Sequence, residues 1–160
     1  MATLTTFLKS AHGKGNPSRK PYLIENVIDL TESAIDCSSG DIVQALTVPT
    51  DTVILWAGIQ VKESATMNTG TNATAILGTA VDDNEYVAAF DIDGASDGVY
   101  APTVAQAGVL VAAAADTLDV TFAGDGATFT AGKLRVFAML MDVSEIGDFT
   151  ANEVDRDLLA

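Results

Sequence analysis

Few side chains in this sequence combine the types and spacing that enzymatic chemistry needs. His12, the only histidine, stands in a segment interrupted by glycines and a proline, so no rigid surroundings would hold it as a general base. Cys37, the only cysteine, has no neighbouring basic residue that would favour its reactive thiolate, and one cysteine permits neither an intrachain disulfide nor a Cys-rich metal site. We therefore predict that the chain is not an enzyme and needs no cofactor.

Two acidic stretches invite a different chemistry, since clustered carboxylates near glycines are typical of Ca²⁺ sites. The stretches are "VDDNE" and "DIDGASDG", with the acidic residues Asp82, Asp83, Glu85, Asp91, Asp93 and Asp97. The second begins like a calcium loop, but Ala95 stands where an oxygen ligand belongs and no bidentate glutamate follows. Solvated turn residues are the favoured interpretation, and no metal site is predicted. Paired carboxylates for glycoside hydrolysis usually come with aromatic sugar platforms, of which one Trp and three Tyr offer few.

The elements that would position these residues are predicted to be strands. Apolar and polar residues alternate in short runs between Gly-, Asp- and Thr-rich turns, and no βαβ rhythm occurs. The expected strands are residues 22–30, 41–48, 52–61, 73–81, 86–92, two strands on either side of Asp116 within 107–122, and 133–143. A polar loop is expected at 62–72, a long loop at 93–102 and glycine-containing turns at 123–132. The pattern predicts an all-β fold, an antiparallel β-sandwich or jelly-roll-like domain over residues 22–143.

Two of the expected strands, residues 52–61 and 133–143, are apolar on both faces. Such a pattern is typical of a central strand or of a strand at a subunit interface. In residues 52–61, strict alternation places Ile54, Trp56 and Gly58 on one side and Val53, Leu55, Ala57, Ile59 and Val61 on the other. The candidates for contacts between subunits are Ile54, Trp56, Phe137, Met139 and Met141. The alternative, that one sandwich covers both faces itself, stays open.

Charge divides the chain into unequal parts. Residues 1–24 hold four basic and no acidic residues, and the remainder holds four basic and 22 acidic residues, so a net +4 precedes a net −18. The acidic body disfavours nucleic acid and anionic membranes as partners. Residues 1–21 are expected to be an extended basic arm that offers Lys9, Lys14, Arg19 and Lys20 to an acidic partner, and 144–160 an acidic tail. No secretory signal or long apolar run is found, so we expect synthesis in a reducing compartment.

Three segments together resemble small virion structural proteins of tailed bacteriophages. They are "GDIVQALTVPTDTVILWAGIQV" (40–61), "ATAILGTAVDDNEYVAAFDIDGAS" (73–96) and "AADTLDVTFAGDGATFTAGKLRVFAMLMDVS" (114–144), which spread over about two-thirds of the chain. The shared layout is a strand into a V-P turn, a strand into an acidic loop, an A-D-T-L-x-V strand, a Gly-rich turn and a closing G-K-x-R-V-x-A strand.

The resemblance implies a capsid decoration (cement) protein. Such a protein would lie on the outer surface of the phage head, bind the major capsid protein and clamp neighbouring copies of it. It would be a homo-oligomer, with a trimer favoured, made in the host cytoplasm. Another virion component (head fibre, neck or tail protein) is the alternative, and a carbohydrate- or Ca²⁺-binding sandwich module is a further one.

Overall fold

Alternation of apolar and polar residues produces eight strands in the part of the chain that the computed structural model describes, residues 20–32, 37–102, 110–112, 114–126 and 128–143. In chain order they are β1 (Tyr22–Asp29), β2 (Ile42–Val48), β3 (Thr52–Met67), β4 (Ala73–Gly78), β5 (Val87–Asp91), β6 (Leu110–Ala112), β7 (Asp116–Gly124) and β8 (Phe129–Asp142). The predicted all-β antiparallel sandwich is confirmed. No helix in the described residues is long and apolar enough to cross a membrane.

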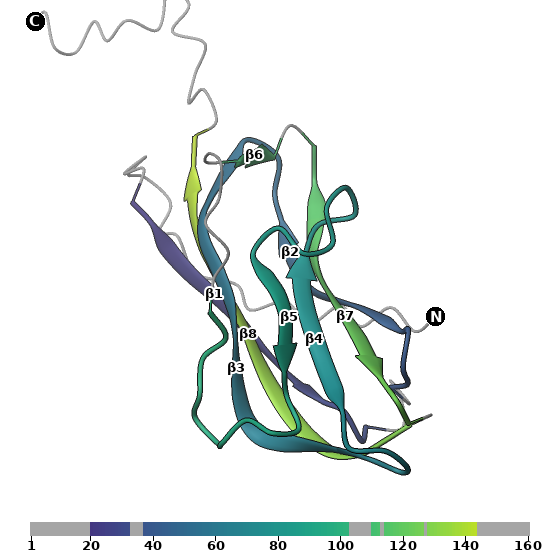
Figure 1. Cartoon of the computed structure of the whole chain (residues 1–160). Coiled ribbons are helices and arrows are strands. Elements are labelled where there is room, and N and C mark those ends of the chain that lie inside the picture. The colour runs from purple at the N-terminus through teal and green to yellow at the C-terminus, as the bar shows by residue number, and fades with distance from the viewer. Residues whose placement is uncertain (1–19, 33–36, 103–109, 113, 127, 144–160) are drawn as a thin grey trace, which may run out of the picture.

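Two four-stranded sheets face each other, one in the order β1-β8-β3-β6 and the other in the order β2-β7-β4-β5 (Figure 1). The antiparallel pairs are nested, because β1 pairs with β8, β2 with β7, β3 with β6 and β4 with β5. This pairing of the first strand with the last, and so on inward, is the strand order of an eight-stranded jelly roll. It also places the two ends of the described chain together, since Tyr22 lies opposite Leu140.

The core lies between the two sheets and consists mainly of aliphatic side chains with few rings. Phe122 of β7 is fully buried and meets Phe129 of β8 edge-on, with 5.6 Å between the ring centroids. The other large side chains with almost no exposure are Leu30, Ile59, Leu77, Tyr86, Ile92, Leu118, Leu134 and Leu140. Asn26 of β1 donates a hydrogen bond to the Ala45 carbonyl of the opposite sheet (3.1 Å), so the inner face of β1 also ties the layers together.

Strand β3 is longer than the sequence predicts, because it continues through the residues expected to open a polar loop at 62–72. Ala65 and Met67 still point inward and are buried, whereas Lys62, Glu63 and Thr66 are exposed to solvent. Lys133 of β8 forms ion pairs with Glu63 of β3 (3.5 Å) and Asp29 of β1 (3.4 Å), which gives these charges partners along the strands. Strand β8 correspondingly begins at Phe129, within the turn expected at 123–132.

Strict alternation in β3, which predicts Ile54 and Trp56 on the same face, is wrong. The register shifts between these residues, with Ile54 opposite Leu140 and Trp56 opposite Met139, so Leu55 is an extra residue against β8. A bulge of this kind turns the following side chains to the other face of the sheet. Ile54 is consequently 3% exposed within the core, whereas Trp56 is 44% exposed on the outside.

The burial of the Asp119 side chain on β7 can be tested through the pH dependence of stability. Burial has the largest effect and raises the pKa of the Asp119 carboxyl. A hydrogen bond with the Thr117 hydroxyl lowers this pKa by a smaller amount, and the charge of Asp116 raises it further. Because the raised pKa makes the ionised side chain unfavourable in the folded state, stability falls as pH rises from the ordinary value near 4 through the folded pKa. We expect Asp119→Asn to raise the melting temperature at pH 7 and to change it little at pH 3, measured by thermal scans across this range.

Asp125 supplies a control of opposite sign. Its carboxylate accepts bonds from the backbone and side-chain nitrogens of Asn72 (3.1 and 2.9 Å), which lower its pKa. That stabilisation is present above the unfolded pKa and is lost as pH falls through the folded one. Asp125→Asn should therefore lower the melting temperature at pH 7 and converge with the wild type in acid. If Asp119→Asn also lowered the melting temperature at pH 7, the raised pKa of the Asp119 carboxyl would be refuted.

Candidate interaction surfaces

The outer face of the β1-β8-β3 sheet carries a cluster of exposed apolar side chains. Register brings them together, because Leu23 of β1 and Trp56 of β3 both lie opposite Met139 of β8. Leu23 is 47%, Trp56 44% and Met139 36% exposed. With Phe137 and Tyr100 they form what is here called the Trp56 patch. Its groove of about 410 Å³ is lined by Leu23, Trp56, Tyr100, Arg135, Phe137 and Met139.

Gly58 explains how three aromatic rings meet on this face. Phe137 lies opposite Gly58, and a Cβ on that glycine would come within 2.9 Å of the Phe137 ring, so only glycine leaves the space that the ring occupies. Trp56 packs against Phe137 with centroids 4.9 Å apart, and Tyr100 meets it edge-on at 5.8 Å. Phe137 is thereby 4% exposed and serves as the base on which the two exposed rings rest.

Tyr100 reaches the patch from the segment between β5 and β6. The Ala101 amide donates to the Ile59 carbonyl (2.9 Å), the Val61 amide donates to the Val99 carbonyl (2.9 Å), and Tyr100 forms a bridge with Gln60. This segment therefore runs beside β3 as a short additional edge. Neither Tyr100 nor Leu23 could be predicted as a surface candidate from the sequence, since neither has a signal that places it beside Trp56.

Arg135 forms the polar border of the patch together with its hydrogen-bond partners. Arg135 Nε and Nη2 donate to Glu25 Oε2 in an ion pair, and Arg135 Nη1 donates to Gln60 Oε1 (3.4 Å). The guanidinium also lies 5.6 Å from the Phe137 ring centroid, within the range of a cation–π contact. Because the arginine is held by partners from β1 and β3, the border is fixed in place beside the apolar groove.

Of the predicted subunit-interface residues, the structure brings together Trp56, Phe137 and Met139. Met141 is half-buried one step further along β8, opposite Val53. Ile54 is absent from this face for the reason given above, which corrects its choice as a surface candidate. Of the predicted arm residues, Lys20 is exposed immediately before β1, whereas Lys9, Lys14 and Arg19, like His12 and the acidic tail, lie outside the described residues.

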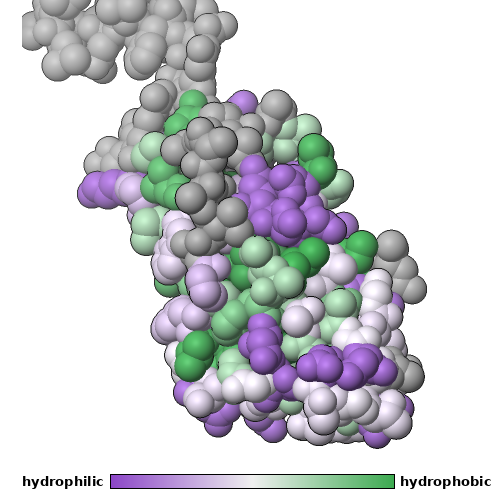
Figure 2. Space-filling model, viewed as in Figure 1, coloured by the Kyte–Doolittle hydropathy of each residue, from purple (hydrophilic) through white to green (hydrophobic). Residues whose placement is uncertain are grey.

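A second concave site lies at the end of the sandwich where β1 begins and β8 ends. It is a pocket of about 440 Å³ between β6 and the β4–β5 loop. Figure 2 shows strongly hydrophilic residues gathered over that loop. The pocket's lining residues are Val48, Ile54, Thr79, Val81, Asp82, Glu85, Ala112, Ala114, Ala115 and Asp116.

The acidic loops do not converge on a metal-binding arrangement, since no group of three or more His, Cys, Asp or Glu side chains suited to a metal occurs among the described residues. Asp91 Oδ1 instead accepts hydrogen bonds from the amides of Gly94 (2.8 Å) and Asp93 (3.1 Å), which lower the pKa of the Asp91 carboxyl. The Asp97 carboxylate accepts a hydrogen bond from the Ser64 amide (3.1 Å). These carboxylates shape turns. Cys37 is buried with 1% exposure, away from solvent.

No protein-family model matches the chain, and no curated protein matches it. Solved structures do resemble it. A chain of the cyanophage Pam1 capsid asymmetric unit is 16% identical with a TM-score of 0.60, covering 86% of this chain and 93% of that one. The capsid of Ralstonia phage GP4 gives 17% identity and a TM-score of 0.55 over 87% and 91% of the two chains. The acidic stable capsid structure of Helicobacter pylori bacteriophage KHP30 gives 9% and 0.53 over 76% and 86%. The chain thus has a fold found in three phage capsid structures.

Proposed function

We propose that the chain is a phage capsid decoration protein, which binds the outer surface of the icosahedral head and stabilises contacts between neighbouring major capsid proteins. The observation that carries the proposal is the likeness in fold to chains of three phage capsids, which extends over 76–87% of this chain. The sequence motifs described above support the same assignment. A decoration protein needs a rigid scaffold and surfaces for interaction, and the sandwich with its exposed Trp56 patch fits both needs.

The Trp56 patch is proposed as the contact between copies of the chain, with a trimer favoured. Its composition of Trp, Tyr, Met and Arg is that of energetically dominant interface positions. Side chains this large are seldom left exposed together on a monomer. A stable contact needs about 800 Å² from each partner, so the patch would form the centre of a larger interface. Several copies joined in this way would attach to a symmetric shell with greater avidity than one.

The direct test uses emptied, expanded shells of the virus that encodes the chain. Purified protein is expected to bind them to saturation, and shells without it are expected to rupture at lower temperature than decorated shells. Cosedimentation and thermal-release measurements report the two quantities. Absence of binding to any shell form would refute the proposal in favour of a neck, tail or fibre location.

Deletion of residues 1–20 is expected to weaken shell attachment by about tenfold at low salt, because four basic side chains would lose their acidic partners on the shell. The sandwich should still fold, since its strands begin at Tyr22. Titration of shells with the truncated and intact proteins measures the difference.

A variant that replaces Lys9, Lys14, Arg19 and Lys20 by glutamine keeps the length of the segment and removes only its charge. It should bind as weakly as the truncation and lose most of the salt dependence. Equal shell occupancy of all three proteins would contradict the attachment role of the segment.

A carbohydrate-binding module is the second candidate, favoured by the exposed rings of Trp56 and Tyr100 beside the polar side chains Arg135, Glu25 and Gln60. The Trp56 and Tyr100 rings are tilted by 59° and 77° against the Phe137 ring, however, so the three rings do not form one flat platform for a sugar face. Binding to a glycan array that Trp56→Ala abolishes, together with failure to bind shells, would favour this candidate.

A further inference from the structure

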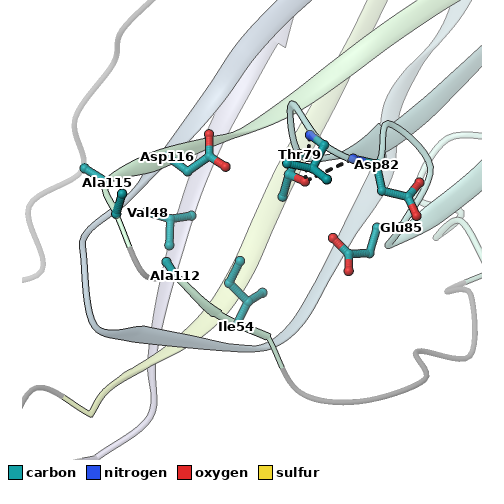
Figure 3. A pocket seen from close by; sticks show the side chains of 10 residues that line it. Val48, Ile54, Thr79, Asp82, Glu85, Ala112, Ala115 and Asp116 are labelled. Carbon is teal, nitrogen blue, oxygen red and sulfur yellow. Dashed lines mark hydrogen bonds between the residues drawn. The ribbon is translucent and has the colours of Figure 1, made fainter.

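The pocket at the end of the sandwich joins an apolar floor to an acidic rim. Val48 of β2, Ile54 of β3 and Ala112 of β6 lie on one side, and the β4–β5 loop with Asp82 and Glu85 lies across from them (Figure 3). Asp116, at the start of β7, adds a third carboxylate, and none of the ten lining residues is basic. The site therefore fits a ligand that presents an apolar group next to a positive charge.

The loop that carries the rim is held in a defined shape. Thr79 Oγ1 accepts hydrogen bonds from the amides of Val81 and Asp82 (3.4 Å each), and the Thr79 amide donates to the Asp82 carbonyl (2.8 Å). The loop folds back over Gly78 so closely that a Cβ there would clash with the backbone of Asp82 and Asp83. The backbone that carries the acidic rim is thus fixed by hydrogen bonds and close packing.

Negative charge on the rim is not neutralised by basic side chains of the pocket lining. Burial raises the pKa of the Glu85 carboxyl, and the charge of Asp82 raises it further. Both effects make the ionised Glu85 carboxylate less favourable here than it would be in water. A cation placed against Asp82 and Glu85 would relieve this repulsion between the two carboxylates.

One segment of the chain has the required chemistry and starts close to the pocket. Residues 1–19 hold the apolar pair Phe7 and Leu8, directly followed by Lys9, and contain no acidic residue. They join the sandwich at Lys20, just before β1. Tyr22 lies opposite Leu140, which lies opposite Ile54 of the pocket wall, so about 10 Å separates the start of β1 from that wall. The twelve residue steps from Leu8 to Lys20 can extend about 40 Å, well beyond this distance.

We propose that this pocket binds the chain's own N-terminal segment, with Phe7 and Leu8 against the floor of Val48 and Ile54 and Lys9 at the carboxylates of Asp82 and Glu85. Tethering raises the effective concentration of the segment at the pocket to about millimolar, so a few weak contacts suffice. The inference does not rest on the capsid role. If that role holds, the pocket binds the basic segment in the free protein, and the shell competes with the pocket for the same segment.

A pair of cysteines tests the contact in the full chain. We would introduce Leu8→Cys together with Val81→Cys, because Val81 lines the pocket and is 93% exposed. The control pair is Leu8→Cys with Val27→Cys, which is 53% exposed on the outer face of β1. After mild oxidation without shells, an intramolecular 8–81 disulfide is expected at least fivefold in excess of 8–27, measured by mass spectrometry of the monomer band.

Charge variants complete the test. Asp82→Asn with Glu85→Gln should reduce the yield of the 8–81 disulfide severalfold, whereas Asp97→Asn, on a loop that does not line the pocket, should leave it unchanged. Equal crosslinking at positions 81 and 27 would overturn the proposal. Covalent dimers in place of the intramolecular product would overturn it in favour of a neighbouring copy's segment. Because no shell is present, neither result bears on capsid attachment, which the shell titration decides separately.

Discussion

Replacement of Trp56 by alanine is expected to weaken the association between copies of the chain by about thirtyfold or more, a loss of about 2 kcal/mol. Trp56 is the largest exposed side chain of the patch, and its ring is already held in place by Phe137. A partner that covers it removes a large apolar surface from water at little cost in side-chain entropy. Sedimentation velocity over a dilution series measures the change.

Two further variants separate association from folding. Met139→Lys places a charge in the same patch without disturbing the contact between Trp56 and Phe137, so it should weaken association and leave the melting temperature nearly unchanged. Ile42→Ala removes a side chain that is 41% exposed on the other sheet, and it should affect neither. A wild-type protein that stays monomeric at high micromolar concentration would contradict the role of the patch in self-association.

The strands could be predicted from the sequence because the two-residue period and the turn residues are local signals. Residues 42–48, 73–78 and 87–91 fall within the strands expected from alternation, and Asp116 does mark the division between β6 and β7. The second half of β3 could not be predicted, because it contains polar residues such as Glu63 and Thr66. They face solvent at strand spacing, and a polar loop has the same composition.

The surfaces were harder to predict, since they depend on single irregularities and on distant segments. One extra residue, Leu55, places Ile54 inside and Trp56 outside, and alternation alone gives no sign of it. Tyr100 joins the patch through backbone bonds to β3 across some forty residues of chain. The pocket combines residues of β2, β3, β6 and β7 with the β4–β5 loop, which only the nested strand order brings together.

Phe122→Ala is expected to lower the free energy of unfolding by about 3–5 kcal/mol, the largest change in stability expected for one substitution here. The ring is fully buried on β7, which lies inside its sheet between β2 and β4, and it packs against Phe129 of the opposite sheet. Its removal leaves a cavity that neighbouring strands cannot close without breaking their register. Since domains of this size are stable by about 5–15 kcal/mol, much of the margin would be lost.

Denaturant unfolding monitored by circular dichroism measures the effect, with Phe90→Ala as the matched control. Phe90 lies on the edge strand β5 and is only half-buried, so the same change of side chain should cost clearly less. Comparable losses at both positions would mean that Phe122 does not occupy the centre of the core. A folded but destabilised Phe122→Ala protein should still associate through the Trp56 patch, because that surface lies on the outer face of the other sheet.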